Sequence, residues 1–269
     1  MKNRYIGENI RTIIEIIEQL NVKNQPGLII FADFTKAFDS LDHDYIFSVF
    51  EKFNFGEHMI NWIKPFYNNI SSIVINNGNL SQQFNIERGV RQGCPLSSII
   101  FILCIEILSN RIEQNDNIKG IQIGNKEIKQ SLFADDATFF NNGDEASFKQ
   151  LFETLNTFSK VSGLNLNTNK TTILRVGSLK HTTLTYLPNN KFVWTSTSAK
   201  TIGINFYNDT QETLKFNLEP KLNEFKNCLK QWQHRKLTLM GKITVIKTFA
   251  LPKLIYLNAK VLQHFNSQF

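Results

Sequence analysis

Apolar residues recur at helical spacing in several long stretches of this chain. In the first stretch, Ile10, Ile13, Ile14 and Ile17 lie three or four positions apart with charged residues between them. Such spacing places apolar side chains on one face of a helix. The same reasoning predicts helices over residues 6–20, 35–53, 58–68, 95–113 and 145–161, and a basic helical region from residue 218 onward.

Shorter apolar segments between these helices predict β-strands. Residues 28–31 are continuously apolar, which is typical of a strand buried on both faces. Asn-Asn-Gly-Asn at 76–79 separates two strand-like segments and predicts a hairpin. Further strands are expected within 121–140, with turns at 124–126 and 135–136, and at 171–176 and 201–206. Strands mixed with long helices indicate an α+β fold.

The charge of the chain points to a polyanionic partner. Its 269 residues include 30 Lys and Arg against 23 Asp and Glu, a net charge of +7, which is typical of proteins that bind nucleic acid. The cysteines have no C-x-x-C spacing, and this argues against a zinc ribbon. The longest apolar run, 99–105, is too short to span a bilayer. We therefore expect an intracellular protein of the nucleus, the cytoplasm or both, without membrane insertion.

Three aspartates occupy the ends of the most apolar strand-like segments. Asp33 follows the strand at 28–31, and Asp135 and Asp136 lie at the turn of a second apolar hairpin. Central strands end close together, so these carboxylates would repel one another unless a cation neutralised them. A hard divalent cation, which prefers oxygen ligands, would neutralise these carboxylates. Taken alone, Asp-Asp is more often an ordinary turn sequence than a metal site.

Five ordered motifs resemble those of reverse transcriptases. Phe-Ala-Asp-Phe-Thr-Lys-Ala-Phe-Asp (31–39) resembles the first palm motif, and Gly-Val-Arg-Gln-Gly-Cys-Pro-Leu-Ser-Ser (89–98) resembles the motif that supports template and nucleotide. Phe-Ala-Asp-Asp (133–136) is similar to the catalytic hairpin. Residues 162–171 resemble the next palm motif, and Ile-Gly-Ile-Asn (202–205) resembles the primer grip. The tail from 232 to 256 is similar to the thumb of non-LTR, LINE-like polymerases.

This resemblance implies a metal site. Asp33 and Asp135 would bridge two Mg²⁺ ions, with Mn²⁺ as a substitute, and Asp136 would assist. The backbone carbonyl of Phe34 would be a further ligand. Two such ions, about 3.5–4 Å apart, activate an attacking oxygen and stabilise a leaving one. The reaction implied is transfer of dNTPs onto a primer 3′-OH.

The resemblance also implies substrate contacts. Phe38 stands where the family has an aromatic gate against the ribose 2′-OH, although a core role would also suit a phenylalanine. Gln92 and Gly93 would lie against the nascent base pair, where a glycine lets the backbone approach closely. Lys170 stands where the family has a lysine near the triphosphate, and a solvated surface lysine is an equal alternative.

The domain organisation follows from the same resemblance. It implies a right-hand palm with an antiparallel sheet at residues 28–209, a residual fingers segment at 1–27 and a helical thumb, possibly incomplete, at 210–269. The resemblance implies that such elements have fingers and an endonuclease region upstream, and we expect both to be missing from this sequence. We therefore expect weak dNTP binding, and self-association through an exposed apolar face of Ile10, Ile14 and Ile17.

Two functions remain open from the sequence. The first is an RNA-directed DNA polymerase that binds an RNA template and a DNA primer. The second is a catalytically weak or inactive nucleic-acid-binding remnant of a retroelement. The basic residues between 226 and 236 would suit a nucleic-acid backbone in both cases.

Several local motifs have ordinary structural interpretations. Trp62 and Phe66, four residues apart, are expected in the core. His43 is expected at the surface or in a helix cap, and Ser97 in a cap of the helix behind Pro95. Asp42 belongs to an acidic cluster that is expected to supply charge at a helix start.

Overall fold

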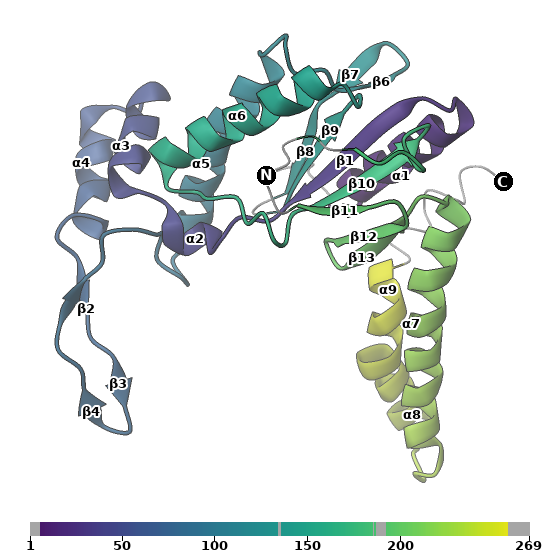
Figure 1. The fold of residues 1–269 in the computed structure, drawn as a ribbon. Coiled ribbons are helices and arrows are strands. Elements are labelled where there is room, and N and C mark those ends of the chain that lie inside the picture. The colour runs from purple at the N-terminus through teal and green to yellow at the C-terminus, as the bar shows by residue number, and fades with distance from the viewer. Residues whose placement is uncertain (1–5, 134–135, 185, 187–191, 258–269) are drawn as a thin grey trace.

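The computed structural model describes residues 6–133, 136–184, 186 and 192–257 (Figure 1). Its helices are α1 (Ile6–Val22), α2 (Ala37–Ser40), α3 (His43–Lys52), α4 (Glu57–Ile63), the 3₁₀ helix η1 (Lys64–Phe66), α5 (Pro95–Glu113), α6 (Glu145–Ser162), α7 (Thr210–Gln233), α8 (Leu239–Val245), the π-helix η2 (Ile246–Ala250) and α9 (Leu251–Leu257). Its strands are β1 (Pro26–Ala32), β2 (Ser71–Ser72), β3 (Ile75–Asn76), β4 (Asn79–Leu80), β5 (Phe84–Asn85), β6 (Ile121–Ile123), β7 (Lys126–Ile128), β8 (Gln130–Phe133), β9 (Asp136–Asn141), β10 (Thr172–Gly177), β11 (Val193–Thr195), β12 (Ser198–Thr201) and β13 (Ile204–Tyr207).

A five-stranded sheet in the order β11-β10-β1-β9-β8 organises the molecule. β1 lies at its centre and pairs antiparallel with both β9 and β10, while β11 joins β10 in parallel. Six of the seven residues of β1 are buried, which confirms the strand predicted from the apolar run. Alternate side chains of β1 enter two separate cores, so helices cover both faces of the sheet.

Helix α1 covers one face of the sheet. Ile10, Ile14 and Ile17 are at most 1 % exposed and pack in one core cluster with Ile29 and Phe31 of β1. The prediction that this helix face is exposed is therefore wrong. The apolar stripe was recognised correctly, but the sheet of the same chain covers it.

Helices α3, α5 and α6 cover the opposite face. Helix α5 is the only helix of the described residues that is long and apolar enough to cross a membrane, judged by length and composition. Seven of its residues are buried, including Phe101 and Leu108, which are completely inaccessible. Packing against the sheet and the neighbouring helices thus accounts for the apolar character of α5.

The single helix predicted over residues 35–53 is wrong, because the chain reverses within it. Lys36 adopts a left-handed conformation with φ of 45°, and Leu41 is extended, so α2 is only one turn long. Asp42 then caps α3, accepting hydrogen bonds from the backbone N–H groups of Asp44 and Tyr45 at 3.0 and 3.3 Å. This confirms the helix-start role predicted for Asp42.

Three local predictions were wrong. His43 is buried, and its Nε2 lies 2.9 Å from the carbonyl oxygen of Gly89. Trp62 and Phe66 are 79 % and 46 % exposed, because helix α4 buries other apolar side chains instead. The Ser97 hydroxyl donates to the Arg91 carbonyl at 2.6 Å and does not cap α5.

Two extensions project from the rest of the molecule in the same general direction (Figure 1). One is the hairpin β2–β5, whose tip β3–β4 turns at Asn77 and Gly78, both with positive φ; this confirms the hairpin prediction. The other is the helical unit α7–α9. Both extensions carry exposed large apolar side chains: Ile73, Val74, Ile75, Leu80 and Phe84 on the hairpin, and Leu239, Met240, Phe249 and Ile255 on the helices.

Candidate active site

The carboxylates of Asp33 and Asp136 lie at the ends of neighbouring central strands. β1 and β9 pair Ala32 with Ala137, and one further step in this antiparallel register sets Asp33 opposite Asp136. Both residues are half-buried and line one cavity of about 240 Å³. The strand ends therefore bring together two of the three aspartates that the sequence singled out. Asp135 lies outside the described residues.

The backbone of Asp33 is held by the segment that follows α6. Its N–H donates to the Thr171 hydroxyl at 3.3 Å, and its carbonyl accepts from the Asn167 N–H at 2.7 Å. Thr35 N–H donates in turn to the Asn165 carbonyl at 2.9 Å. These bonds fix the strand end while leaving the Asp33 side chain on the cavity.

Phe34 has a backbone carbonyl that this ladder does not use. Phe34 lies opposite Leu166 in a β-bridge, but the hydrogen bonds of this bridge are made by the residues on either side of Phe34, Asp33 and Thr35. In an antiparallel ladder such a residue directs its own N–H and C=O to the other side of its strand. For Phe34 that is the side of β9, where Asp136 lies. This orientation suits the ligand role predicted for the Phe34 carbonyl.

Two lysines line the same cavity as the aspartates. Lys170 follows the loop that anchors Asp33, and Lys200 comes from β12 of a separate two-stranded hairpin. Both are exposed. Sequence reasoning found Lys170 but missed Lys200, although Lys200 lies only two positions before the Ile202-Gly203 motif. The cavity thus combines carboxylates on the sheet with two cationic side chains.

Phe38 lies on α2 with its ring stacked on Phe101 of α5. The ring centroids are 4.4 Å apart, and the side chain is half-buried. Its carbonyl accepts from the Val90 N–H at 2.7 Å. The ring is thus a packed side chain with one accessible part, a geometry that suits both roles considered for it; the gate role stays a prediction.

Gln92 and Gly93 belong to a segment that is fastened to α2. Gln92 is exposed, and its Nε2 donates to Asp39 Oδ1 at 3.2 Å. A Cβ on Gly89 would come within 2.8 Å of the Asp39 backbone. Within this segment, Gly89 is therefore the glycine that lets another part of the backbone approach closely. A Cβ on Gly93 would meet no protein atom within 4 Å, but its φ of +80° favours glycine. Their contact with a base pair stays a prediction.

The donor atoms of this site fit a magnesium ion. Carboxylate oxygens of Asp33 and Asp136 and the carbonyl of Phe34 are the hard oxygen ligands that Mg²⁺ prefers. Among the described residues, no group of three or more His, Cys, Asp or Glu side chains could hold a metal. Asp135 would be the additional carboxylate, next to Asp136 in the chain.

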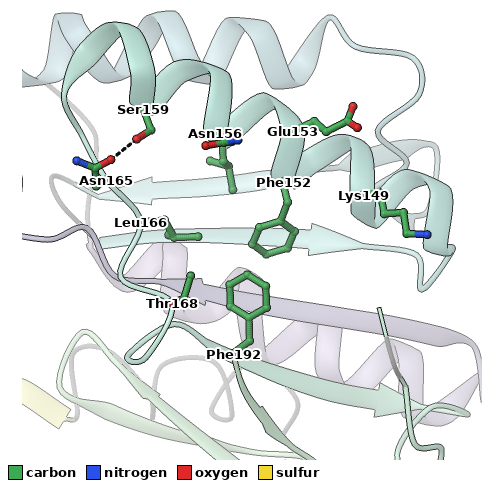
Figure 2. Close-up of a pocket in the computed structure, with 10 residues that line it drawn as sticks. Lys149, Phe152, Glu153, Asn156, Ser159, Asn165, Leu166, Thr168 and Phe192 are labelled. Carbon is green, nitrogen blue, oxygen red and sulfur yellow. Dashed lines mark hydrogen bonds between the residues drawn. The ribbon is translucent and has the colours of Figure 1, made fainter. Parts of the chain in front are cut away.

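A second cavity, of about 370 Å³, lies between α6 and the loop that anchors Asp33. Figure 2 shows the rings of Phe152 and Phe192 next to each other, with Leu166 alongside; the two ring centroids are 4.6 Å apart. The Ser159 hydroxyl of α6 donates to Asn165 Oδ1 at 2.5 Å, which ties the loop to the helix. Helix α6 therefore supports the loop from behind.

Comparison with protein families accounts for this arrangement. Residues 3–233 match the family model described as reverse transcriptase (RNA-dependent DNA polymerase). The chain belongs to the reverse transcriptase family. This membership confirms the family to which the five sequence motifs pointed.

Retrotransposon proteins are among the relatives of this reverse transcriptase. The transposon TX1 uncharacterized 149 kDa protein of Xenopus laevis is 24 % identical over 94 % of this chain. The Pol polyprotein of the Drosophila melanogaster type-2 retrotransposable element R2DM is 29 % identical over 59 % of it. The aligned regions span only 19 % and 15 % of those two proteins. These relatives confirm the predicted likeness to non-LTR, LINE-like elements.

Solved telomerase structures share the fold of this reverse transcriptase. Apo telomerase from Candida tropicalis, truncated from its C-terminal domain, has a TM-score of 0.53 over 76 % of this chain and 39 % of its own, at 16 % identity. Telomerase from Candida albicans, in complex with a fragment of telomeric RNA, has the same TM-score over 98 % and 44 % at 13 % identity. At such low identity the similarity concerns the fold alone, and it confirms the predicted polymerase fold. The domain boundaries at residues 27 and 209 stay predictions.

Proposed function

We propose that this chain is the RNA-directed DNA polymerase region of a LINE-like retrotransposon and that it extends a DNA primer on an RNA template. The observation that carries the proposal is the shared cavity of Asp33 and Asp136 at the ends of β1 and β9, within a reverse transcriptase sequence. Carboxylates at this position suit nucleotidyl transfer, because that reaction depends on charge stabilisation and positioning.

The aspartates would serve as ligands for two Mg²⁺ ions. Asp33, Asp135 and Asp136 would hold them through carboxylate oxygens, with the Phe34 carbonyl as a further oxygen donor. When bound, such ions neutralise developing charge and activate the attacking oxygen. The chain's own contribution is to fix the donors: the Thr171 hydroxyl and the Asn167 N–H hold the backbone on either side of the Asp33 side chain.

The lysines would neutralise the phosphates of the incoming dNTP. The primer 3′-oxygen attacks the α-phosphate, and the bond to the β-phosphate breaks to release pyrophosphate. Lys170 and Lys200 line the cavity of the aspartates from two different elements. Charge-assisted hydrogen bonds from such ammonium groups would stabilise the departing pyrophosphate, and Lys170 could donate a proton to it.

Helix α7 and the turn after it would hold the primer–template duplex. Lys226, Lys230, Arg235 and Lys236 are all exposed. The guanidinium of Arg235 lies 4.5 Å from the centroid of the Trp232 ring, and this contact orients it. Such contacts to phosphates give affinity without sequence preference, and they weaken as salt is added.

Primer extension tests this function against the binding-only alternative. A DNA primer annealed to an RNA template is incubated with the 269-residue chain, the four dNTPs and Mg²⁺, and products are resolved on a denaturing gel. We expect template-directed extension that requires Mg²⁺. Binding of the duplex without any extension, at dNTP concentrations up to the millimolar range, would favour the inactive remnant.

A further inference from the structure

A groove of about 530 Å³ lies along the outer edge of the sheet and shares no lining residue with the aspartates' cavity. Its walls are the N-terminal part of α1 and one face of α5, and its floor is β8. All four residues of β8, Gln130–Phe133, line it. Because successive side chains of a strand point to opposite faces, a groove lined by all four runs along the strand edge.

The edge of β8 offers hydrogen-bonding groups to the groove. β8 is the last strand of the sheet and pairs only with β9. The Lys129 carbonyl accepts from the Phe140 N–H at 2.8 Å, so these two residues form a hydrogen-bonded pair. Hydrogen-bonded pairs and pairs without hydrogen bonds alternate along an antiparallel ladder. The N–H and C=O groups of Gln130 and Leu132 therefore point away from β9, toward the groove.

The rim of the groove is acidic in a chain whose net charge is +7. Glu8 of α1 and Glu106 and Glu113 of α5 contribute three carboxylates. Lys129, next to Gln130 in the chain, is buried; its Nζ donates to the Glu113 backbone carbonyl at 3.1 Å and lies 4.0 Å from the Glu127 carboxylate. Its charge is thus directed to the end of α5.

The residues that line the groove combine apolar surface with one acceptor that has no described partner. Ile102 and Ile105 of α5 and Phe133 of β8 supply the apolar surface. The Gln130 Nε2 donates to Ser109, but its Oε1 is buried without a hydrogen-bond partner in the part of the chain that the structure describes.

We propose that this groove docks an extended, basic segment of another protein, which adds to the sheet as a strand next to β8. Its backbone would pair with Gln130 and Leu132, its lysines or arginines would meet the three glutamates, and alternate apolar side chains would cover Ile105 and Phe133. Strand addition of this kind draws affinity from main-chain hydrogen bonds and specificity from the side chains. Nucleic acid and a second copy of this groove are both disfavoured, because each would face the glutamates with negative charge.

A capped, fluorescein-labelled hexapeptide, Lys-Val-Arg-Val-Lys-Val, provides the test. Its affinity for the full chain is measured by fluorescence anisotropy, and backbone hydrogen exchange is followed with and without peptide. We expect saturable binding and slower exchange at Gln130 and Leu132, because their amides gain partners. The double variant Glu106→Lys, Glu113→Lys should bind about tenfold more weakly.

Matched controls separate docking from general charge attraction. Glu57→Lys, Glu153→Lys makes the same charge change at exposed positions of α4 and α6, away from the groove, and should bind as the wild type does. The same hexapeptide with alternate backbone N-methyl groups should lose binding, because it cannot complete a strand ladder. Equal binding of a Glu-Val-Glu-Val-Glu-Val peptide, unchanged exchange in β8, or no saturable binding would each overturn the proposal.

Discussion

The backbone carbonyl of Asp33 accepts a hydrogen bond from the Asn167 N–H at 2.7 Å. This bond connects the first aspartate motif to the loop that follows α6. The loop starts at Gly163, which has φ of +80° and caps α6. A Cβ at Gly163 would lie 2.4 Å from the Ser40 carbonyl oxygen. One glycine therefore brings together α6, α2 and the segment that holds Asp33.

Gly163→Ala should destabilise the chain by about 2 kcal/mol or more, because it combines a left-handed alanine with a backbone clash. The measurement is the midpoint of thermal unfolding, which should fall by several degrees. Gly56→Ala is the matched control, since Gly56 has φ of −62° and open space around its Cβ position. A Gly163→Ala variant as stable as the Gly56→Ala variant would refute this packing.

Phe38→Ala should admit ribonucleotides more readily, if Phe38 is the gate against the 2′-OH. The stack on Phe101 adds a second expectation: removal of the ring should also cost about 1–3 kcal/mol of stability. The measurement is the ratio of kcat/KM for dNTP and rNTP in single-nucleotide extension.

Phe101→Leu separates the two effects of the Phe38 ring. It removes the stacking partner but leaves Phe38 in place, so it should lower stability without relaxing sugar selectivity. An unchanged dNTP preference in an active Phe38→Ala variant would exclude the gate role and leave packing as its function.

Lys170→Gln and Lys200→Gln should each raise the KM for dNTP about tenfold, because each removes one cation from the cavity of Asp33 and Asp136. Lys126→Gln, at an exposed position on the β6–β7 hairpin, is the control. Primer–template affinity should not change in any of the three. If Lys200→Gln leaves dNTP kinetics unaltered, Lys200 serves another purpose in the cavity.

Cys94 should react with iodoacetamide far faster than Cys104. Hydrogen bonding from the backbone N–H of Leu96 lowers the pKa of the Cys94 thiol, while burial raises the pKa of Cys104 to about 12. Since a lowered pKa yields thiolate at lower pH, the Cys94 labelling rate should reach its midpoint below that of N-acetylcysteine. Mass spectrometry of tryptic peptides across pH 6–10 measures both rates. A midpoint above that of the free thiol would contradict the assigned hydrogen bonding.

The sequence predicted the parts of the fold that local pattern controls. The spacing of apolar residues placed α1, α5 and α6 within a few residues of their observed bounds. The continuous apolar run predicted β1 as a buried strand. In these cases the pattern and the tertiary packing demand the same structure.

The sequence did not reveal features that depend on distant contacts. His43 is buried because Gly89 lies beside it, and Trp62 is exposed because no part of the chain that the structure describes packs over that face of α4. The break at Lys36 serves the pairing of α2 with residues 89–90, which local propensity does not encode. Lys200 lies at the site because β12 is next to the aspartates, although the two segments are far apart in the sequence.

The pair Asp33→Asn and Asp135→Asn tests the central claim, that these carboxylates hold the catalytic metals. Each variant is compared with wild type and with Asp116→Asn, a matched change in an exposed turn, for extension on an RNA template and for primer–template affinity. We expect extension to be lost in the first two variants and retained in the third. Duplex affinity should remain within about twofold in all three, because it resides mainly in basic contacts. Extension at near wild-type rate by either Asp33→Asn or Asp135→Asn would contradict the account.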